Sequence, residues 1–280
     1  MPWVRIESGA YWCVFVAAFL GVAIWESYRP RRSLCVSTEH RWRNHALLLL
    51  VCTGVSMGVY RASPVFIAAS VAGNRFGLLN KPWLPFAARC ILAVFVLDLV
   101  KYSLHRACHS VALLWRVHQV HHSDPDFDVS TTFRVHPIEL IFTQSGYFGA
   151  IMILAAPPVA VLIAELASTL LGFLGHANAR LPEWLEGPVR TIFVTPDLHR
   201  IHHSEEIREQ NRNLADIFSW WDRLFGTYVP SPAAGQAQMI TGLTGFQSSR
   251  SLDFAFMFLQ PFLPEHRRGA AEDTRMAKGN

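Results

Sequence analysis

The sequence is poor in charged residues. Only 16% of its 280 residues are Asp, Glu, Lys or Arg, and 51% are hydrophobic, whereas a soluble domain carries about 25% charged residues. This balance argues against an ordinary soluble domain. The basic residues form no long run and the net charge is only +4, so nucleic acid is not an expected partner.

Several signatures of other protein classes are also missing. The five cysteines are scattered without a CxxC pair, so no disulfide scaffold is indicated. No Gly-rich dinucleotide loop follows a predicted strand, and no haem-binding or flavin module is recognisable. Cys108 could contribute a metal ligand, but a buried thiol more often acts as a small hydrophobe.

Long apolar segments are what the sequence does contain. A membrane-spanning helix needs about 20 mostly apolar residues. Candidate spans are Ser8–Trp25, Ala46–Tyr60 with a continuation at Ala62–Gly73, Pro82–Leu104 and Leu140–Ala164. The second span is either long and tilted or ends near Arg61. Because consecutive prolines cannot continue a helix, we expect two helices within residues 138–175, joined at Pro157 and Pro158.

The distribution of arginines predicts the orientation. The loop Arg29–His45 carries five arginines, whereas Gly73–Lys81 carries only Arg75 and Lys81. Since excess Lys and Arg marks the cytoplasmic side, the first loop should be cytoplasmic. Counting the crossings from there places every candidate ligand at the cytoplasmic face.

The predicted fold is therefore an all-α integral-membrane bundle of four to five apolar spans with a cytosolic helical cap. The cap comprises residues 181–264, in which Leu252–Leu263 is too short to span and should be an interfacial or core helix. We expect one domain, residues 1–264, followed by a disordered polar tail, residues 265–280.

Histidine is strongly clustered. The chain has thirteen histidines, of which five lie within residues 105–122 and three within residues 199–203. They form three groups: His105 and His109; His118, His121 and His122; and His199, His202 and His203.

The spacing of these histidines predicts metal binding. Residues three or four positions apart share a helix face, and neutral imidazole is the commonest protein ligand for metal ions. Eight histidines exceed the four ligands of one tetrahedral zinc site, so we expect two metal ions. Isolated histidines, such as His40, His45 and His266, are better explained as helix caps or solvent-facing residues.

Two further histidines lie where a predicted span meets the cytosolic face. His176 is expected to be a metal ligand, because a two-metal site needs a contribution from the second membrane hairpin. His136 either binds metal as well or fixes the turn before Pro137.

The three histidine groups resemble the histidine boxes of the fatty acid hydroxylase and sterol desaturase superfamily. The segments 118–128 (HQVHHSDPDFD), 133–139 (FRVHPIE), 175–178 (GHAN) and 221–228 (WDRLFGTY) also resemble that family, so that the similarity extends over residues 80–230. The resemblance implies a membrane-embedded di-iron centre, O2 as oxidant, and hydroxylation or desaturation of a lipid such as an acyl chain, a sterol, an ether lipid or an ornithine lipid.

Iron suits imidazole ligands and, unlike zinc, changes its oxidation state. Because the chain has no recognisable redox module, the electrons must come from a separate ferredoxin-like or cytochrome-type donor with its reductase. We expect this donor to dock near the basic first loop.

Carboxylates near the histidines are further candidates. Asp98 and Glu165 should face the same interior as His105 and His176, because each lies within about 20° of the corresponding helix face. We expect both along the substrate cavity, although Asp98 could instead pair with Lys101. Candidates to accept a hydrogen bond from a ligand's second ring nitrogen are Asp124, Asp126, Asp128, Glu139, Asp197 and Asp222.

Two other functional classes remain open. A membrane zinc-dependent hydrolase would use similar ligands, but no HExxH-type glutamate lies beside them to act as general base. A haem or metal carrier would need histidine pairs across helices inside the bilayer, whereas these histidines cluster at one face.

Overall fold

The computed structural model describes residues 2–73 and 75–263, with side chains from residue 9 onward. Throughout these residues the secondary structure is helical, apart from the isolated bridges Phe193–Phe218 and Ser204–Thr241. The prediction of an all-α fold is confirmed. The predicted tail, residues 265–280, lies outside the described residues.

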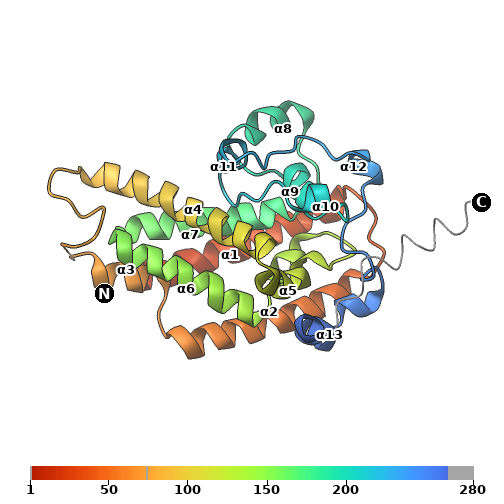
Figure 1. Cartoon of the computed structure of the whole chain (residues 1–280), viewed down its shortest axis with the longest axis horizontal. Coiled ribbons are helices and arrows are strands. Elements are labelled where there is room, and N and C mark those ends of the chain that lie inside the picture. Colours follow the sequence, from red (N-terminus) through yellow and green to blue (C-terminus); the bar gives the residue numbers. More distant parts are fainter. Residues whose placement is uncertain (1, 74, 264–280) are drawn as a thin grey trace, which may run out of the picture.

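Seven helices form the elongated part of the molecule (Figure 1). They are α1 (Pro2–Tyr28), α2 (Thr38–Tyr60), α3 (Pro64–Val71), α4 (Phe86–Ser110), α5 (Ala112–His122), α6 (Pro137–Leu154) and α7 (Pro158–Gly175). Helix α7 packs against α1, α3 and α4, and α4 packs against α6. The largest core cluster lies between α3, α4, α6 and α7 and includes Leu97, Ile151 and Val161.

Four segments are long and apolar enough to cross a membrane: Gly9–Tyr28, Thr38–Val71, Pro137–Leu154 and Pro158–Gly175. Their outward faces carry large exposed hydrophobic side chains, including Leu20, Leu50, Met57 and Ile153. Such an apolar surface is stable in contact with lipid tails and costly in water. The predicted number of spans is confirmed.

Helix α4 differs from these four because it carries Arg89, Asp98, Lys101 and Arg106. The segment that we predicted as the third span therefore forms a long helix, but its composition alone does not meet the criterion for a span. Two of the charges, Asp98 and Lys101, are bonded to neighbouring segments. Helix α4 thus turns one face, with Leu97 and Asp98, toward the core, while Phe86, Ile91 and Leu92 stay exposed.

The helices are interrupted at the two positions expected from the sequence, near Arg61 and before the paired prolines. Helix α2 ends at Tyr60, and Arg61 adopts a left-handed conformation with φ of 49°, which ends the helix rather than tilting it. Helices α6 and α7 are joined at Ala155–Pro157, where Ala155 is also left-handed. Gly77 approaches Ala155 so closely that a side chain at position 77 would collide with it.

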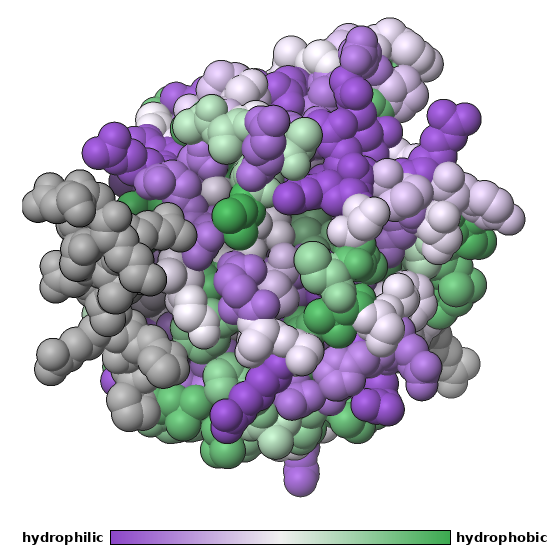
Figure 2. Space-filling model, turned by 90° about the vertical axis from the view of Figure 1, so that its right-hand side faces the viewer, coloured by the Kyte–Doolittle hydropathy of each residue, from purple (hydrophilic) through white to green (hydrophobic). Residues whose placement is uncertain are grey.

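The remaining chain forms a cap at one end of the bundle (Figure 1). Its elements are α8 (Glu183–Arg190), α9 (Pro196–His202), α10 (Ile207–Gln210), α11 (Trp220–Leu224), α12 (Gly235–Gln238), α13 (Phe254–Leu259) and the 3-10 helices η1 (Val129–Phe133), η2 (Ser249–Leu252) and η3 (Gln260–Phe262). Met257 of α13 is fully buried, so the predicted non-spanning helix packs in a core. The end face of the molecule has a large hydrophilic share with scattered hydrophobic groups (Figure 2).

Candidate metal centre

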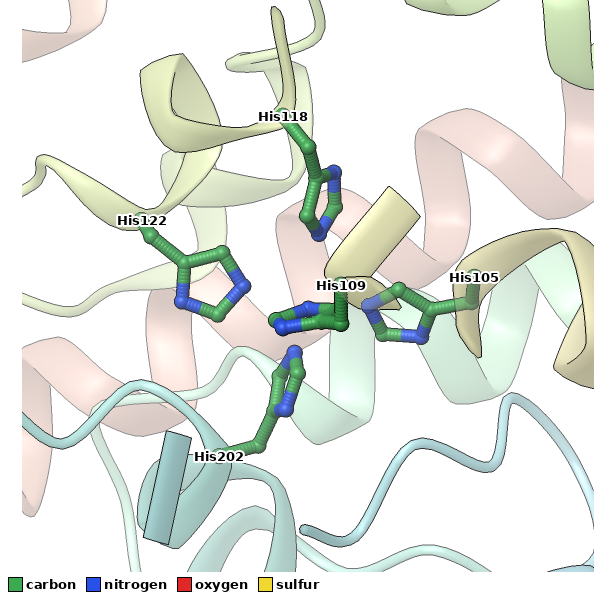
Figure 3. Close-up of side chains that lie close together, drawn as sticks. All are labelled: His105, His109, His118, His122 and His202. Atoms are coloured by element: carbon green, nitrogen blue, oxygen red, sulfur yellow. The ribbon is translucent and has the colours of Figure 1, made fainter. Parts of the chain in front are cut away.

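Five histidines from three helices point toward one another (Figure 3). They are His105 and His109 of α4, His118 and His122 of α5, and His202 of α9, and one ring nitrogen of each lies within 4.8 Å of the others. We refer to these five as the first histidine group. All three histidine boxes thus contribute side chains to one site.

The inward ring nitrogens of the first group have no protein partner. The Nε2 atoms of His105, His109, His118 and His202 are buried without a hydrogen bond, as are both ring nitrogens of His122. A buried nitrogen left unsatisfied costs about 1–3 kcal/mol, and five such costs at one point would be severe. A metal ion bound by these lone pairs removes them.

The outward Nδ1 atoms, in contrast, are held in place. Nδ1 of His105 lies 2.8 Å from the Leu214 carbonyl oxygen, and Nδ1 of His202 lies 3.0 Å from that of Arg212. Nδ1 of His109 lies 3.2 Å from Asn211 Oδ1. Donation from Nδ1 leaves the Nε2 lone pair free and fixes the ring orientation, which is how proteins prepare imidazole for metal binding.

A second group contains His121 of α5, His176 after α7, and His199 and His203 of the third box. Nε2 of His176 lies 3.2 Å from Nε2 of His121 and 3.0 Å from Nε2 of His199. Two metal–nitrogen bonds of about 2.1 Å at right angles place their nitrogens about 3 Å apart. The second group therefore has the spacing of ligands around one ion.

Each HxxHH box divides its histidines between the two groups. In α5, His118 and His122 lie in the first group and His121 in the second; in the third box, His202 lies in the first, with His199 and His203 in the second. Neighbouring helical residues point about 100° apart, so consecutive histidines reach different sites. The rings of His122 and His203 stack at 4.6 Å between centroids, so the two sites adjoin.

Burial keeps these imidazoles neutral. Desolvation lowers the pKa of His122, His199, His202 and His203 well below the ordinary value, and neighbouring histidines lower it further. The neutral form is the one that binds metal. In its donor atoms and protonation state, the nine-histidine cluster fits two transition-metal ions.

His136 is not part of either group. Its Nδ1 accepts a hydrogen bond from the Ile138 amide at the start of α6, and its Nε2 lies 3.2 Å from the Phe258 carbonyl oxygen. Both ring nitrogens are thus engaged away from the metal-facing imidazoles. The expectation that it might be a ligand is wrong, and the alternative, that it fixes the turn before α6, holds.

Asp98 has a structural role rather than a place along a substrate cavity. Its carboxylate accepts hydrogen bonds from the Ile217 and Phe218 amides, both at 3.1 Å, and from Trp221 Nε1 at 2.7 Å. The side chain is buried and bonds the cap to α4. The cavity expectation for Asp98 is therefore wrong.

Glu165 lies in a polar cluster between α4 and α7. Lys101 Nζ is 3.3 Å from its carboxylate and donates to Ser168 Oγ at 2.7 Å. Lys101 thus pairs with Glu165 and not, as the alternative proposed, with Asp98. Whether Glu165 also contacts substrate stays a prediction.

Glu139 supports the first group directly. Its Oε1 lies 2.7 Å from Nδ1 of His118, which gives a carboxylate–histidine pair of the kind that strengthens metal ligation. Cys108 is buried beside this pair. The cysteine is not one of the five residues of the first group; with His118 and Glu139 it forms a separate close group of candidate ligand atoms.

A buried ionic cluster behind α5 was not foreseen from the sequence. Arg41 of α2 is fully buried and contacts Asp124 at 2.5 and 3.0 Å and Asp128 at 3.1 Å. Asp126 accepts hydrogen bonds from the Cys35 and Val36 amides. These contacts fix the loop that follows His122. The acidic HHSDPDFD segment was a signal, but its partner lies more than 80 residues away.

The chain was compared with known proteins. The family model described as fatty acid hydroxylase matches residues 90–227, which include all nine clustered histidines. An ornithine lipid hydroxylase of Rhizobium tropici is 31% identical over 261 residues, which cover 91% of this chain and 76% of that protein. The chain belongs to the fatty acid hydroxylase family.

Other members of the family are similar over shorter stretches. An alkylglycerol monooxygenase of Xenopus tropicalis is 31% identical over 69% of the chain and 42% of its own length. Methylsterol monooxygenase 1 of Rattus norvegicus is 32% identical over 52% of the chain and 48% of its own length. The chain therefore spans less than half of each of these two relatives. No solved structure matches.

Family membership and the four apolar segments agree with each other. The chain is an integral membrane protein and a lipid-hydroxylating oxidoreductase of the fatty acid hydroxylase family. The predictions of family, fold and enzyme class are confirmed.

Proposed function

We propose that the two histidine groups bind a pair of iron ions, with which the enzyme uses O2 to hydroxylate a C–H bond of a membrane lipid. The observation that supports this most strongly is the division of each HxxHH box between two adjoining all-imidazole sites. Imidazole donors suit iron, and iron can change its oxidation state.

When bound, the iron pair supplies oxidation of an unactivated C–H bond: one atom of O2 becomes the hydroxyl oxygen and the other leaves as water. The balance requires two electrons and two protons from outside. We propose a ferredoxin-like or cytochrome-type donor for them. The chain's own residues orient the imidazoles through their Nδ1 atoms and exclude bulk water by burial.

We further propose an amino-acid-containing lipid as substrate. The relative from Rhizobium tropici is named for ornithine lipid, and the chain covers three quarters of its length. The alkylglycerol and methylsterol monooxygenases are matched over less than half of theirs. The ether lipid and the sterol are accordingly weaker candidates.

The experiment is a comparison of membrane lipids from cells with and without the gene, grown under 18O2. We expect one lipid to gain a single 18O atom, and His121→Ala or His203→Ala to abolish that gain. A new double bond without label would indicate desaturation. Full activity in both variants would contradict the assignment of the ligands.

A zinc-dependent hydrolase is less well supported. It needs a carboxylate beside an open metal position to act as general base. Within the described residues, Glu139 is the carboxylate grouped with a clustered histidine, and its Oε1 already meets Nδ1 of His118, on the ring edge away from the metal-facing Nε2.

We propose that the histidine groups lie on the cytoplasmic side, because the arginine-rich loop after α1 adjoins them. Cys35 in this loop is exposed, and its amide bonds to Asp126 near the second box. In a variant that keeps only this cysteine, a membrane-impermeant maleimide should label it only after the inner membrane is opened. Labelling in intact spheroplasts would contradict the proposed orientation.

A further inference from the structure

A polar cavity of about 350 Å³ lies between α8, α9 and the loop after α1. Its charged lining consists of three arginines and three acids: Arg31, Arg180, Arg190, Glu183, Glu186 and Asp197. None of these is a clustered histidine, and the proposed chemistry has no use for the cavity. Its charges sum to zero, so it suits neither a simple anion nor a nucleic acid.

The arginines of the cavity are already paired. Arg31 contacts Asp197 at 3.3 Å, and Arg180 contacts Glu183 at 2.5 Å. Arg190 makes two hydrogen bonds to Glu186 Oε1 and a third to the Pro230 carbonyl oxygen. An anionic ligand would have to displace these partners.

Hydrogen-bond acceptors, in contrast, are left over. The second carboxylate oxygens of Glu186 and Asp197 and the side-chain oxygen of Gln236 are buried without a partner. Gln236 donates its amide nitrogen to the Asp197 carbonyl oxygen at 2.7 Å, which fixes the side-chain oxygen as the free atom. Asp197 is only 8% exposed. A ligand with several N–H donors would match these three acceptors, two of which are carboxylate oxygens.

A primary ammonium group has these properties, since it carries one positive charge and three donors. Hydrogen bonds from a charged donor to a carboxylate are roughly twice as strong as neutral ones. A carboxyl or amide oxygen of the same ligand would have to share the arginines with the acids that they already contact. The free acceptors of the lining therefore match the ammonium group of an amino acid moiety.

The cavity also lies at the level of lipid headgroups. Arg31 follows the end of the first apolar segment, Tyr28, by three residues, and Arg180 follows the end of the fourth, Gly175, by five. On α8, Trp184 is 73% exposed, and tryptophan is enriched at the membrane–water interface. Asp197 lies two residues before His199 of the second histidine group, so a headgroup bound here stays close to the metal centre.

We propose that this cavity is a headgroup subsite that binds the primary ammonium group of an amino-acid-derived lipid. The inference rests on the proposed function, because it names the part of the lipid substrate that the enzyme recognises. The ammonium group bonds to Glu186, Asp197 and Gln236, and the acyl chains extend toward the membrane-spanning helices.

The test measures binding to the purified full-length enzyme in detergent by titration calorimetry. The probes are a short-chain ornithine lipid, the same lipid acetylated on its free amine, and free ornithine. We expect acetylation to weaken binding at least about tenfold, because it removes the positive charge and two of the three N–H donors of the amine. Equal binding of the two lipids would overturn the proposal, and so would free ornithine binding as tightly as the lipid.

Two variants and a matched control assign the effect to the cavity. Glu186→Gln keeps an oxygen for Arg190 but replaces the free acceptor by an amide, and Gln236→Leu removes an acceptor from a different segment. Glu39→Gln makes the same charge change at an exposed position in the first turn of α2, outside the cavity lining. We expect about tenfold weaker lipid binding in the first two and less than about twofold change in the control.

Equal binding in all three variants would overturn the subsite. The labelling experiment with 18O2 is scored separately. Label incorporation without any effect of Glu186→Gln would leave the proposed function in place and reject the subsite. Amine-dependent binding without any label would support the subsite and reject the proposed reaction.

Discussion

At the scale of single residues, the site depends on what each imidazole does with its second nitrogen. Backbone carbonyls hold His105, His176 and His202, whereas His118 is held by the carboxylate of Glu139. A charged acceptor makes the ring a better donor to the metal than a neutral one does. Glu139 should therefore raise the metal affinity of the first group through His118, although it is not itself a proposed ligand.

Glu139→Gln tests this directly. The amide oxygen can still accept the hydrogen bond of His118, but the charge is lost, so we expect metal affinity to fall about 10–100-fold. The measurement is competition between the protein and a chelator for the bound metal. Glu183→Gln, an exposed change on α8, serves as control, and unchanged affinity in Glu139→Gln would contradict the role.

Arg41 is the second residue with a specific expectation. Its guanidinium group is buried between Asp124 and Asp128, whose pKa values it holds below the ordinary range against the opposing effect of burial. Removing one partner of a buried pair costs about 3–5 kcal/mol. Arg41→Met should lose that much stability in denaturant unfolding, whereas Arg43→Met, at an exposed position of the same helix, should lose little. Equal effects of the two would show that the cluster does not stabilise the fold.

The sequence identified the clustered histidines and one group that supports them, Glu139, but not the other supporting groups. Histidine spacing singled out eight imidazoles that the structure brings together, because residues three or four positions apart share a helix face, and the position of His176 after the second membrane hairpin added the ninth. The carbonyl oxygens of Leu214 and Arg212 are invisible in a sequence, since every residue has one. His136 was overestimated because a helix-capping histidine and a ligand look alike until both ring nitrogens are placed.

At the scale of helices, the position of α4 decides where the first histidine group forms. Gly146 of α6 faces Leu104, the residue before His105: a Cβ at position 146 would lie 2.8 Å from a Leu104 methyl carbon. This contact therefore favours a small residue at the point where α6 meets α4 near the metal ligands.

Gly146→Val should therefore displace the end of α4. Overpacking of this kind costs about 1–3 kcal/mol, and the shift should reduce the metal retained after purification. Gly149→Val on the same helix meets nothing within 4 Å and is the matched control. Comparable metal content and stability in the two variants would contradict this view of the helix contact.

The helices were predictable to different degrees. The apolar runs and the paired prolines at 157 and 158 specified α6 and α7, because proline ends a helix regardless of its surroundings. Helix α4 was harder to classify, since its charges are tolerated only through partners far away in the sequence. The cap could be placed only in outline, because its short helices are held by long-range hydrogen bonds such as those of Asp98.

At the scale of the whole molecule, burying so many neutral imidazoles makes stability depend on pH. The pKa values of His122, His199, His202 and His203 are lowered by desolvation, whereas histidines of the unfolded chain titrate near about 6.5. Below that pH the unfolded chain binds more protons than the folded one. Stability therefore falls as pH falls below about 6.5 and is flat above it.

Metal-free protein should accordingly melt at lower temperature at pH 5 than at pH 7, with little difference between pH 7 and pH 8. Thermal unfolding in detergent measures this, and bound metal should be released over the same acid range, because protons compete for the same nitrogens. A melting temperature that rises toward pH 5 would show that these rings are not buried in neutral form.

The central claim, that nine imidazoles hold two ions in two adjoining sites, is tested most directly by counting iron. In protein reconstituted anaerobically with ferrous iron, we predict about two irons per chain, with about one retained in His202→Ala, which damages the first group, and about one in His199→Ala, which damages the second. A wild-type content of about one ion would contradict the two-site account, and so would an undiminished iron content in both variants.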